Sequence, residues 1–406
     1  MLLSIRNVFS KNKKLLIDNQ SHDIFGRSKV AFSFEERALL LAEESDIVVL
    51  RKILPPKYVE FVMGSCNFRV IYLKSNNEEM DLSEVILEEK NLHILKQLIE
   101  ENNDYNYTIQ SYIPDKGIDL VSKKLRIPIS GYDFFVNNCK KSQTQNLCNK
   151  LGLKTVTSIY LQTHSDIYDK NVLSVIKKYK KVIVKPDFGM GGDSMFVLET
   201  NKLPESKVSL SFPILIQELM RLDREGSIQF IRFSNKWSIC LCETYQSNFK
   251  YYGFRFPFCT PFVDEFVLTS KKIFDYFYDR YDNISSFGID FIISDGKVYY
   301  HDINPRNTAA TYIFSLIIRL YGYGILNSVE LEYLQIEYKC EIEYYKLRYY
   351  IEKEGLKHIS RNNAEGFALI YPGMLKNKLI NVIFVSQSHK IDEYRQLFFI
   401  VTKKYI

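Results

Sequence analysis

The chain has 406 residues, and because one domain usually takes about 100–200 residues, this length indicates roughly two to four structural units. Hydrophobic residues make up 46%, charged residues 25% and aromatic residues 14% of the chain, a globular composition that excludes collagen-like, low-complexity and largely disordered proteins. The formal net charge of +6 comes from 54 Lys and Arg against 48 Asp and Glu. This small excess is spread over the whole length, so it permits an anionic ligand and does not indicate a nucleic-acid partner.

The cysteines and the apolar runs indicate a cytoplasmic protein. The 7 cysteines form an odd set, and the only close pair, Cys240 and Cys242, lies in an apolar run, so neither a disulfide framework nor a zinc ribbon is predicted. The N-terminus lacks the apolar stretch of a secretory signal, and Arg319 interrupts even the long apolar run 312–326. We therefore expect reduced thiols, no membrane span and a cytoplasmic location.

Residues 1–136 are expected to form a first domain of open α/β type. Short apolar strands are predicted at 47–50 and 68–73, and a helix is predicted at 82–101, where Leu and Ile recur at helical spacing. Alternation of short strands with helices favours an open sheet.

Three further regions follow the first domain. A lysine, a helix and the sequence Leu-Gly-Leu open the region 137–217, and strand-like runs dominate from residue 181 onward. We expect an antiparallel assembly, divided between 137–217 and 218–326. Two late strand patterns predict a small C-terminal α/β unit over 327–406.

A glycine-rich turn after an apolar strand is the first stretch that indicates chemistry. Glycines at 189, 191 and 192 would let backbone N–H groups approach phosphate oxygens, and Lys185, at the end of the strand, would supply a positive charge. A strand follows the turn and no Gly-Lys-Ser/Thr ending is present, so neither a Walker loop nor a dinucleotide fingerprint fits. On its own, the stretch is equally consistent with an ordinary glycine-rich hairpin.

A second stretch, 213–220, is an apolar strand that ends in Gln217 and Glu218. Such a strand end can offer backbone groups to an adenine edge and a carboxylate to a ribose hydroxyl. Without its neighbours, however, a solvated strand end is the more common explanation.

The third stretch, 287–306, contains two apolar strands around Asp295-Gly296, which predicts a hairpin. A two-residue loop would place Asp290 opposite His301 and leave Asp302 on the other face. A three-residue loop with a bulge at Gly296 would instead place Asp290, Asp302 and Asn304 on one face. We predict the three-residue loop, with His301 on the opposite face as a packing residue.

Two acids and an amide oxygen on one face form a candidate metal site. Buried carboxylates are costly unless they bind a cation or pair with Arg306. Asp290, Asp302 and Asn304 supply hard oxygen ligands, which suit magnesium shared with phosphates rather than zinc.

These three stretches, in this order and separation, resemble the ATP-grasp family of ATP-dependent ligases over roughly 120–312. The last motif of that family is usually Glu-x-Asn-x-Arg, and here Asp302 stands in place of the glutamate. The resemblance implies an ATP-grasp fold, with an N-terminal open α/β pre-ATP-grasp domain, a lid subdomain at 137–217 and a large subdomain at 218–326.

The resemblance also implies roles for individual residues. ATP and Mg²⁺ are the implied cofactors, Asp290, Asp302 and Asn304 the implied metal ligands, and Lys185 and Arg306 the implied catalytic cations. Either Asp223 or Glu225 would be the ribose acid. The implied nucleotide-binding residues are Lys140 or Lys141, Lys185, Gly189, Gly191, Gly192, Asp193, Ser194, Gln217, Glu218, Leu219 and Glu225.

The run 304–312 and the small C-terminal unit are similar to amino-acid and peptide ligases of natural-product pathways. This similarity implies an ADP-forming ligase that joins a carboxylate to an amine, or to the thiol of a carrier protein, with Arg306 steadying the acyl phosphate. The alternatives are a carboxylase-like ATP-grasp enzyme that uses carboxyphosphate, and a nucleotide-binding scaffold without turnover. Implied partners are small-molecule substrates and a carrier protein, with a homodimer left open.

Arg255 is a lone cation among aromatic residues at 251–258. It could bind a substrate carboxylate through two hydrogen bonds. Stacking on a neighbouring ring at the surface is an equal alternative.

Overall fold

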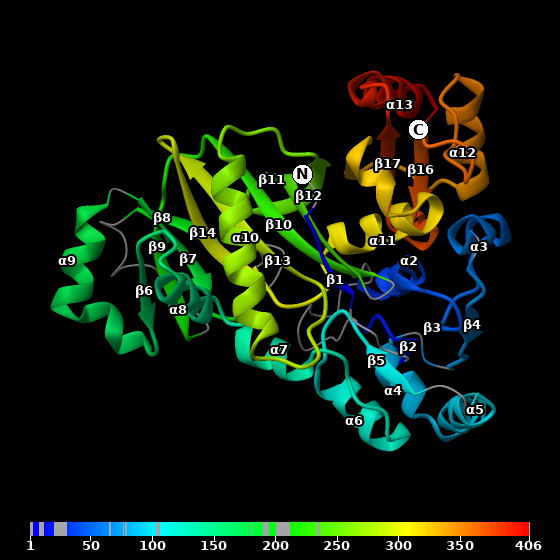
Figure 1. Ribbon diagram of the computed structural model, residues 1–406, viewed down its shortest axis with the longest axis horizontal. Coiled ribbons are helices and arrows are strands. Elements are labelled where there is room, and N and C mark those ends of the chain that lie inside the picture. Colours follow the sequence, from blue (N-terminus) through cyan, green and yellow to red (C-terminus); the bar gives the residue numbers. More distant parts are fainter. Residues whose placement is uncertain are drawn as a thin grey trace.

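Three β-sheets organise the part of the chain that the computed structural model describes (Figure 1). That part comprises residues 3–7, 12–19, 31–64, 66–75, 77, 79–102, 106–179, 181–189, 195–199, 212–233 and 236–405.

The N-terminal region forms a parallel four-stranded sheet in the order β4-β3-β2-β5. Strand β3 lies inside the sheet and is a run of four buried apolar residues, as expected where both faces of a parallel sheet are covered. The predicted open α/β sheet is therefore confirmed. Its strands are β2 (Lys13–Leu16), β3 (Ile47–Leu50), β4 (Arg69–Tyr72) and β5 (Tyr107–Gln110).

Short helical segments surround this sheet. The helix predicted at 82–101 is two helices, because Glu88 adopts a non-helical conformation (φ −57°, ψ 133°) at their junction. The segments are η1 (Ala31–Arg37), α2 (Ala38–Leu41), α3 (Pro56–Met63), α4 (Leu82–Leu87), α5 (Glu89–Glu100) and α6 (Lys116–Leu125).

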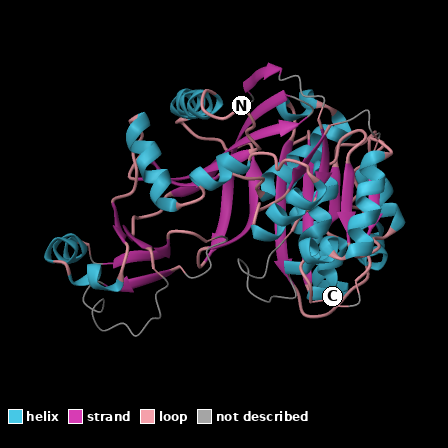
Figure 2. Cartoon of the chain, turned by 90° about the horizontal axis from the view of Figure 1, so that it is seen from below, coloured by secondary structure: helices cyan, strands magenta, loops and turns pink. Residues whose placement is uncertain are grey.

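A small antiparallel sheet in the order β6-β9-β7-β8 lies at one end of the molecule, away from the N-terminal sheet (Figures 1 and 2). Its apolar face forms a separate small core with α9. The elements are α7 (Tyr132–Asn138), α8 (Lys141–Leu151), β6 (Ser158–Leu161), η2 (His164–Tyr168), α9 (Lys170–Lys178), β7 (Lys181–Pro186), β8 (Phe196–Glu199) and β9 (Ile214–Glu218).

The largest sheet has nine strands, all paired in antiparallel fashion, with the main path β14-β13-β10-β11-β12-β15-β17-β16 and β1 paired to β11. Because β12 pairs with β15, the C-terminal strands continue the sheet of the region 218–326. The strands are β1 (Leu3–Asn7), β10 (Arg224–Phe233), β11 (Lys236–Ser247), β12 (Lys250–Phe256), β13 (Phe287–Ser294), β14 (Lys297–Asn304), β15 (Glu330–Glu337), β16 (Gly366–Ile370) and β17 (Leu379–Ser386).

Helices cover both faces of the large sheet. Helix α10 packs on one face in an aromatic core, in which Phe230 and Phe287 stack with ring centroids 4.2 Å apart. Helix α11 is buried along its length and packs on the other face, against Phe254 and Phe256. The helical segments are α10 (Val263–Tyr278), α11 (Ala309–Tyr321), η4 (Tyr323–Asn327), α12 (Tyr344–Lys353), η5 (Pro372–Asn377) and α13 (Ile391–Tyr405). In the described part of the chain, no helix is both long and apolar enough to cross a membrane.

Candidate active site

A cavity of about 210 Å³ lies between the large sheet, the small sheet and the segment after β5. Strands β10 to β14 form its floor, β7 and α8 contribute one lysine each, and the N-terminal domain contributes Tyr112, which follows β5. The polar and charged residues that line it are Tyr112, Lys141, Lys185, Ser227, Gln229, Thr244, Gln246, Tyr251, Asp290, His301, Asp302, Asn304, Arg306 and Thr308.

The hairpin of β13 and β14 differs from the one predicted. Ser294 pairs with Lys297, so the loop has two residues, Asp295 and Gly296, and both have positive φ angles of 49° and 68°. This is the geometry of a tight hairpin turn that Asp-Gly favours. The predicted three-residue loop is therefore wrong.

The extra residue lies inside β14 instead. Phe291 pairs with Tyr300 but Asp290 pairs with Asp302, which leaves His301 as the additional residue of a bulge. The bulge restores the register, so Asp290 and Asp302 lie directly opposite each other on the face toward the cavity.

The same bulge corrects the prediction for His301. As the extra residue it does not follow the alternation of the strand, and it lines the cavity rather than packing on the opposite face. Burial and the neighbouring charge of Lys185 lower the pKa of His301 to about 4, so its ring is neutral at physiological pH.

The acid pair is electrostatically asymmetric. Burial and the charge of Asp302 raise the pKa of Asp290 to about 6. Burial also acts to raise the pKa of Asp302, but the positive charges of Lys141 and Lys185 outweigh it and hold that pKa below its ordinary value. Asp302 is thus balanced by the two lysines, whereas the negative charge of Asp290 is not balanced to the same degree.

Asn304 links the acid pair to Arg306. Its Nδ2 donates to Oδ2 of Asp290 at 2.9 Å, and its Oδ1 accepts from Nη2 of Arg306 at 3.1 Å. The three residues predicted on one face, together with Arg306, therefore form one connected group.

Of the two adjacent lysines, Lys141 reaches the cavity and Lys140 is exposed outside it. Nζ of Lys141 lies 3.8 Å from Oδ2 of Asp302 and donates to the carbonyl of Gly189 at 3.1 Å. The start of α8 is held by Asp187, whose carbonyl accepts from the backbone N–H of Lys141 at 2.8 Å. The segment after β7 thereby positions this lysine.

Lys185 lies on β7 and is buried, with 3% of its surface exposed. Burial lowers its pKa to about 8, against the opposing influence of Asp302. The nearby carboxylates do not fully offset the cost of burying the Lys185 ammonium, so this site is suited to an anionic ligand.

Only part of the predicted glycine-rich loop can be placed. Gly189 lines the cavity. Gly191, Gly192, Asp193 and Ser194 lie outside the described residues.

The predicted adenine-binding segment lies at the end of β9, and none of Gln217, Glu218 and Leu219 lines the cavity. The side chain of Gln217 donates to Oγ of Ser158 at 2.6 Å. The N–H groups of Glu218 and Leu219 donate to the carbonyls of Thr157, just before β6, and Lys181, on β7, at 3.1 and 3.3 Å.

The two candidate ribose acids have different surroundings. Asp223 accepts a hydrogen bond from the backbone N–H of Asp295 at 2.8 Å, so it supports the hairpin turn. Glu225 lies on β10 two residues before Ser227 and therefore on the same face. Burial and the charges of Asp290 and Glu243 raise the pKa of Glu225 to about 7.

A contact with the N-terminal domain was missed by the sequence analysis. The guanidinium carbons of Arg37 and Arg306 lie 4.2 and 4.5 Å from the centroid of the Tyr112 ring. Nη2 of Arg37 also lies 3.3 Å from Oδ1 of Asp18. Tyr112 and Asp18 each follow a parallel strand by two residues, and the carboxyl ends of such strands commonly carry functional groups, which was the available signal.

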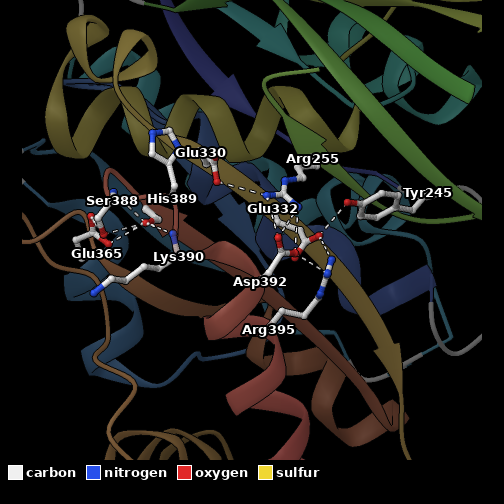
Figure 3. A network of polar contacts seen from close by, with 11 residues as sticks. Tyr245, Arg255, Glu330, Glu332, Glu365, Ser388, His389, Lys390, Asp392 and Arg395 are labelled. Carbon is white, nitrogen blue, oxygen red and sulfur yellow. Dashed lines mark hydrogen bonds and ion pairs between the residues drawn. The ribbon is translucent and has the colours of Figure 1, made fainter. Parts of the chain in front are cut away.

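Arg255 does not reach the cavity, which corrects its proposed role as a substrate ligand. Consecutive residues of a strand point to opposite faces, and Phe254 lines the cavity. The Arg255 guanidinium instead pairs with Asp392 at 3.1 Å and Glu330 at 3.4 Å (Figure 3).

The acid pair fits a magnesium ion. Two facing carboxylates, one of them with a raised pKa, supply hard oxygens and unmatched negative charge. Asn304 would turn its amide oxygen from Arg306 toward the ion. In the described part of the chain, no three His, Cys, Asp or Glu side chains form a metal-binding group, so phosphate oxygens and water would complete the ligands.

Residues 164–310 match the ATP-grasp domain family. The chain carries an ATP-grasp domain. Lys185, Asp290, Asp302 and Arg306 all lie within the matched residues, whereas Lys141 and Tyr112 precede them.

Solved structures show the ATP-grasp fold over nearly the whole chain. N5-carboxyaminoimidazole synthetase from Staphylococcus aureus, complexed with ADP, is 15% identical with a TM-score of 0.57 and 97% of this chain and 98% of that chain covered. The N5-carboxyaminoimidazole ribonucleotide synthetase of Thermus thermophilus is 11% identical with a TM-score of 0.59, covering 96% and 98%. The L-amino acid ligase of Bacillus licheniformis is 13% identical with a TM-score of 0.54, covering 96% and 98%.

A curated relative is an uncharacterized protein of Methanocaldococcus jannaschii, 26% identical over 193 residues. The match covers 44% of this chain and 45% of the relative, so the chain matches less than half the length of that protein.

Proposed function

We propose that this ATP-grasp protein is an ATP-dependent, ADP-forming ligase that activates a carboxylate as an acyl phosphate and joins it to an amine. The observation that carries the proposal is the facing pair Asp290 and Asp302, with Lys141, Lys185 and Arg306 around the same cavity. A triphosphate needs cations at its oxygens, and a metal between carboxylate and phosphate needs hard anionic ligands. This cavity supplies both.

The reaction follows from the charges around the cavity. A carboxylate is a poor electrophile, and transfer of the γ-phosphoryl group to one of its oxygens gives an acyl phosphate and ADP. The amine then attacks the acyl carbon and phosphate leaves. Lys141 and Lys185 hold phosphate oxygens, and Arg306 faces the reacting carboxylate, where it offsets the negative charge of the tetrahedral intermediate.

Magnesium held by Asp290, Asp302 and Asn304 would bridge the phosphate oxygens and offset their charge. Glu225, on the same face as Ser227, is the better placed of the two candidate acids for the ribose. Closure of the small sheet over the nucleotide would exclude water that hydrolyses an acyl phosphate.

Three other assignments remain in competition. The S. aureus and T. thermophilus neighbours are carboxyaminoimidazole synthetases, which favours a carboxylase-like reaction through carboxyphosphate as the second candidate. A carrier-protein thiol could replace the amine as acceptor. A nucleotide-binding scaffold would bind ATP without turnover.

ADP release distinguishes these functions. Full-length protein with ATP and Mg²⁺ is mixed with pairs of amino acids, and ADP and product mass are measured. We expect ADP with selected pairs, together with a product whose mass equals the two reactants less one water. A requirement for bicarbonate would favour the carboxylase, and ATP binding without ADP from any carboxylate would favour the scaffold.

Lys185→Ala tests the role of the cavity in this reaction, and Lys140→Ala is its matched control. The first substitution removes the buried cation, so ATP binding and ADP release should fall together, while Lys140→Ala, which changes an exposed neighbour of Lys141, should leave both unchanged.

A further inference from the structure

The residues that line the floor of the cavity change from charged to neutral across the large sheet. In the strand order β14-β13-β10-β11-β12, the lining residues run from Asp302 and Asp290 through Ser227 to Thr244 and Tyr251. Neighbouring strands lie about 4.8 Å apart, so the floor extends over about 19 Å. This length accommodates phosphates at the charged end and a second molecule at the other.

The middle strand separates the two ends. On β10, Nε2 of Gln229 donates to Oγ of Ser227 at 2.6 Å, and Oγ1 of Thr308 donates to Oε1 of Gln229 at 2.5 Å. Oγ of Ser227 also donates to the carbonyl of Ile289 at 3.2 Å. These polar groups are satisfied within the protein, so they do not call for a charged ligand.

The far end of the floor is neutral. Burial raises the pKa values of the Cys242 thiol and the Tyr251 phenol well above their ordinary values, so both are uncharged at physiological pH. Thr244 and Gln246 offer a hydroxyl and an amide, and two aromatic rings, Phe249 and Phe254, complete the wall. Among the described residues of β11, β12 and the turn between them that line the cavity, none is charged.

We propose that the substrate of the ligase is an amino acid or short peptide with an uncharged aromatic or apolar side chain, which lies over β11 and β12 while its carboxylate faces Arg306. This inference rests on the proposed function and specifies its substrate. A charged group over Thr244 and Tyr251 would lose its hydration, and the lining residues of β11 and β12 offer it no opposite charge. An aromatic side chain would instead bury a large apolar area against the rings.

The inference also opposes a ribonucleotide substrate. A ribonucleotide carries a phosphate away from its reacting amine, and that phosphate would lie over β11 and β12, whose lining residues include no cation. The carboxyaminoimidazole synthetases share the fold, and one of them was solved with 5-aminoimidazole ribonucleotide, so this compound is the rival ligand to test.

Ligand binding can be measured independently of turnover. The melting temperature of full-length protein with ADP and Mg²⁺ is recorded with L-phenylalanine, L-tyrosine or L-leucine, and with L-aspartate, L-glutamate, L-lysine or 5-aminoimidazole ribonucleotide. We expect at least about tenfold tighter binding of a neutral ligand than of any charged one, since transfer of a charge into a neutral pocket is unfavourable. Tighter binding of a charged ligand, or no shift with any neutral one, would overturn the inference.

A charge placed in the floor sharpens the test. Thr244→Lys should weaken binding of the neutral amino acids by at least about tenfold and strengthen binding of L-glutamate. Ser247→Lys is the matched control, because Ser247 lies on the same strand, is exposed and does not line the cavity. Equal effects of the two substitutions would refute the placement.

The two proposals fail in distinguishable ways. If ADP binds with Mg²⁺ and neutral amino acids bind but no ADP is ever released from ATP, the ligase reaction is wrong and the ligand class stands. If ADP is released best with acidic or basic substrates, the reaction stands and the neutral floor does not select the substrate.

Discussion

Two clusters of charged residues lie on opposite faces of the large sheet, and their charges are balanced differently. Thr244 and Phe254 line the cavity. Tyr245 and Arg255, the next residues along β11 and β12, point to the opposite face, where a network of polar contacts is drawn in Figure 3. We use the term network for Tyr245, Arg255, Glu330, Glu332, Asp392 and Arg395. In this network, Arg395 lies 2.6 Å from both Glu332 and Asp392.

The difference supports a ligand site at the cavity rather than at the network. In the network, each guanidinium contacts two carboxylates, and the fully buried Glu332 also accepts a hydrogen bond from Tyr245 at 2.9 Å. Burial raises the pKa of Glu332 as well, but Arg395 and Tyr245 oppose that shift by direct contact. In the cavity, burial lowers the pKa of Lys185 to about 8 and raises that of Asp290 to about 6, so both groups are shifted toward their neutral forms. Charges that the protein itself leaves unmatched are those that a metal-bound nucleotide would complete.

The largest effect expected on activity comes from Arg306. Arg306→Ala should lower kcat by roughly 10²–10³, the usual loss for one donor that stabilises charge in the transition state. The KM for ATP should change little, because Lys141 and Lys185 remain. Steady-state kinetics with circular dichroism of the folded variant checks this, and an unchanged kcat would remove Arg306 from the reaction.

A substitution in the network should lower the stability of the fold rather than the activity. Arg395→Met leaves the fully buried Glu332 with Tyr245 and the more distant Arg255, and we expect a loss of about 2 kcal/mol in the free energy of unfolding. Urea unfolding measures the loss. Lys404→Met on the same helix removes a pair with Glu354 in which the lysine is 55% exposed, so it should cost much less than Arg395→Met. Equal losses of unfolding free energy in the two variants would show that Arg395 stabilises the protein no more than an exposed ion pair does.

The pH dependence of kcat/KM for ATP tests the role of the buried Lys185. Because the pKa of Lys185 is lowered to about 8, the free enzyme loses this charge as the pH rises above that value. The kcat/KM for ATP should therefore fall above pH 8, about tenfold by pH 9. Lys185→Arg keeps its charge in this range, so its profile should stay flat there even if its rate is lower. A wild-type profile that is flat to pH 10 would contradict the assignment.

Tyr112 should give the smallest of these effects. Tyr112→Leu removes the ring that contacts Arg37 and Arg306, and we expect kcat to fall about fivefold with KM for ATP unchanged, in proportion to a cation–π contact of about 1 kcal/mol. Tyr112→Phe keeps the ring and should retain kcat. A similar loss in both variants would point to the hydroxyl rather than to ring stacking.

How far the sequence could predict the structure differs between these elements. The common face of Asp290, Asp302 and Asn304 was predicted, but for the wrong reason, because period-two alternation cannot show where a bulge restores the register. The bulge at His301 has no mark of its own in the sequence, whereas the two-residue turn had one in Asp-Gly.

Contacts between distant segments were harder to predict. Arg306 and Tyr112 are 194 positions apart and meet only because the parallel sheet directs its carboxyl end toward the cavity. Arg255 looked unpartnered in the sequence because Glu330 and Asp392 follow much later in the chain. The local motifs predicted the fold and which acids and lysines line the cavity, and tertiary packing decided the contacts with Tyr112 and Arg255.

Transfer of oxygen from the carboxylate to phosphate tests the central claim most directly. An amino acid that supports ADP release is labelled with heavy oxygen in its carboxylate, and the phosphate released in one turnover is analysed by mass spectrometry. Activation as an acyl phosphate predicts that each phosphate carries one heavy oxygen. Unlabelled phosphate from a productive turnover would contradict the account. If the phosphate instead acquires heavy oxygen only when labelled bicarbonate is supplied, the site carries out carboxyphosphate chemistry.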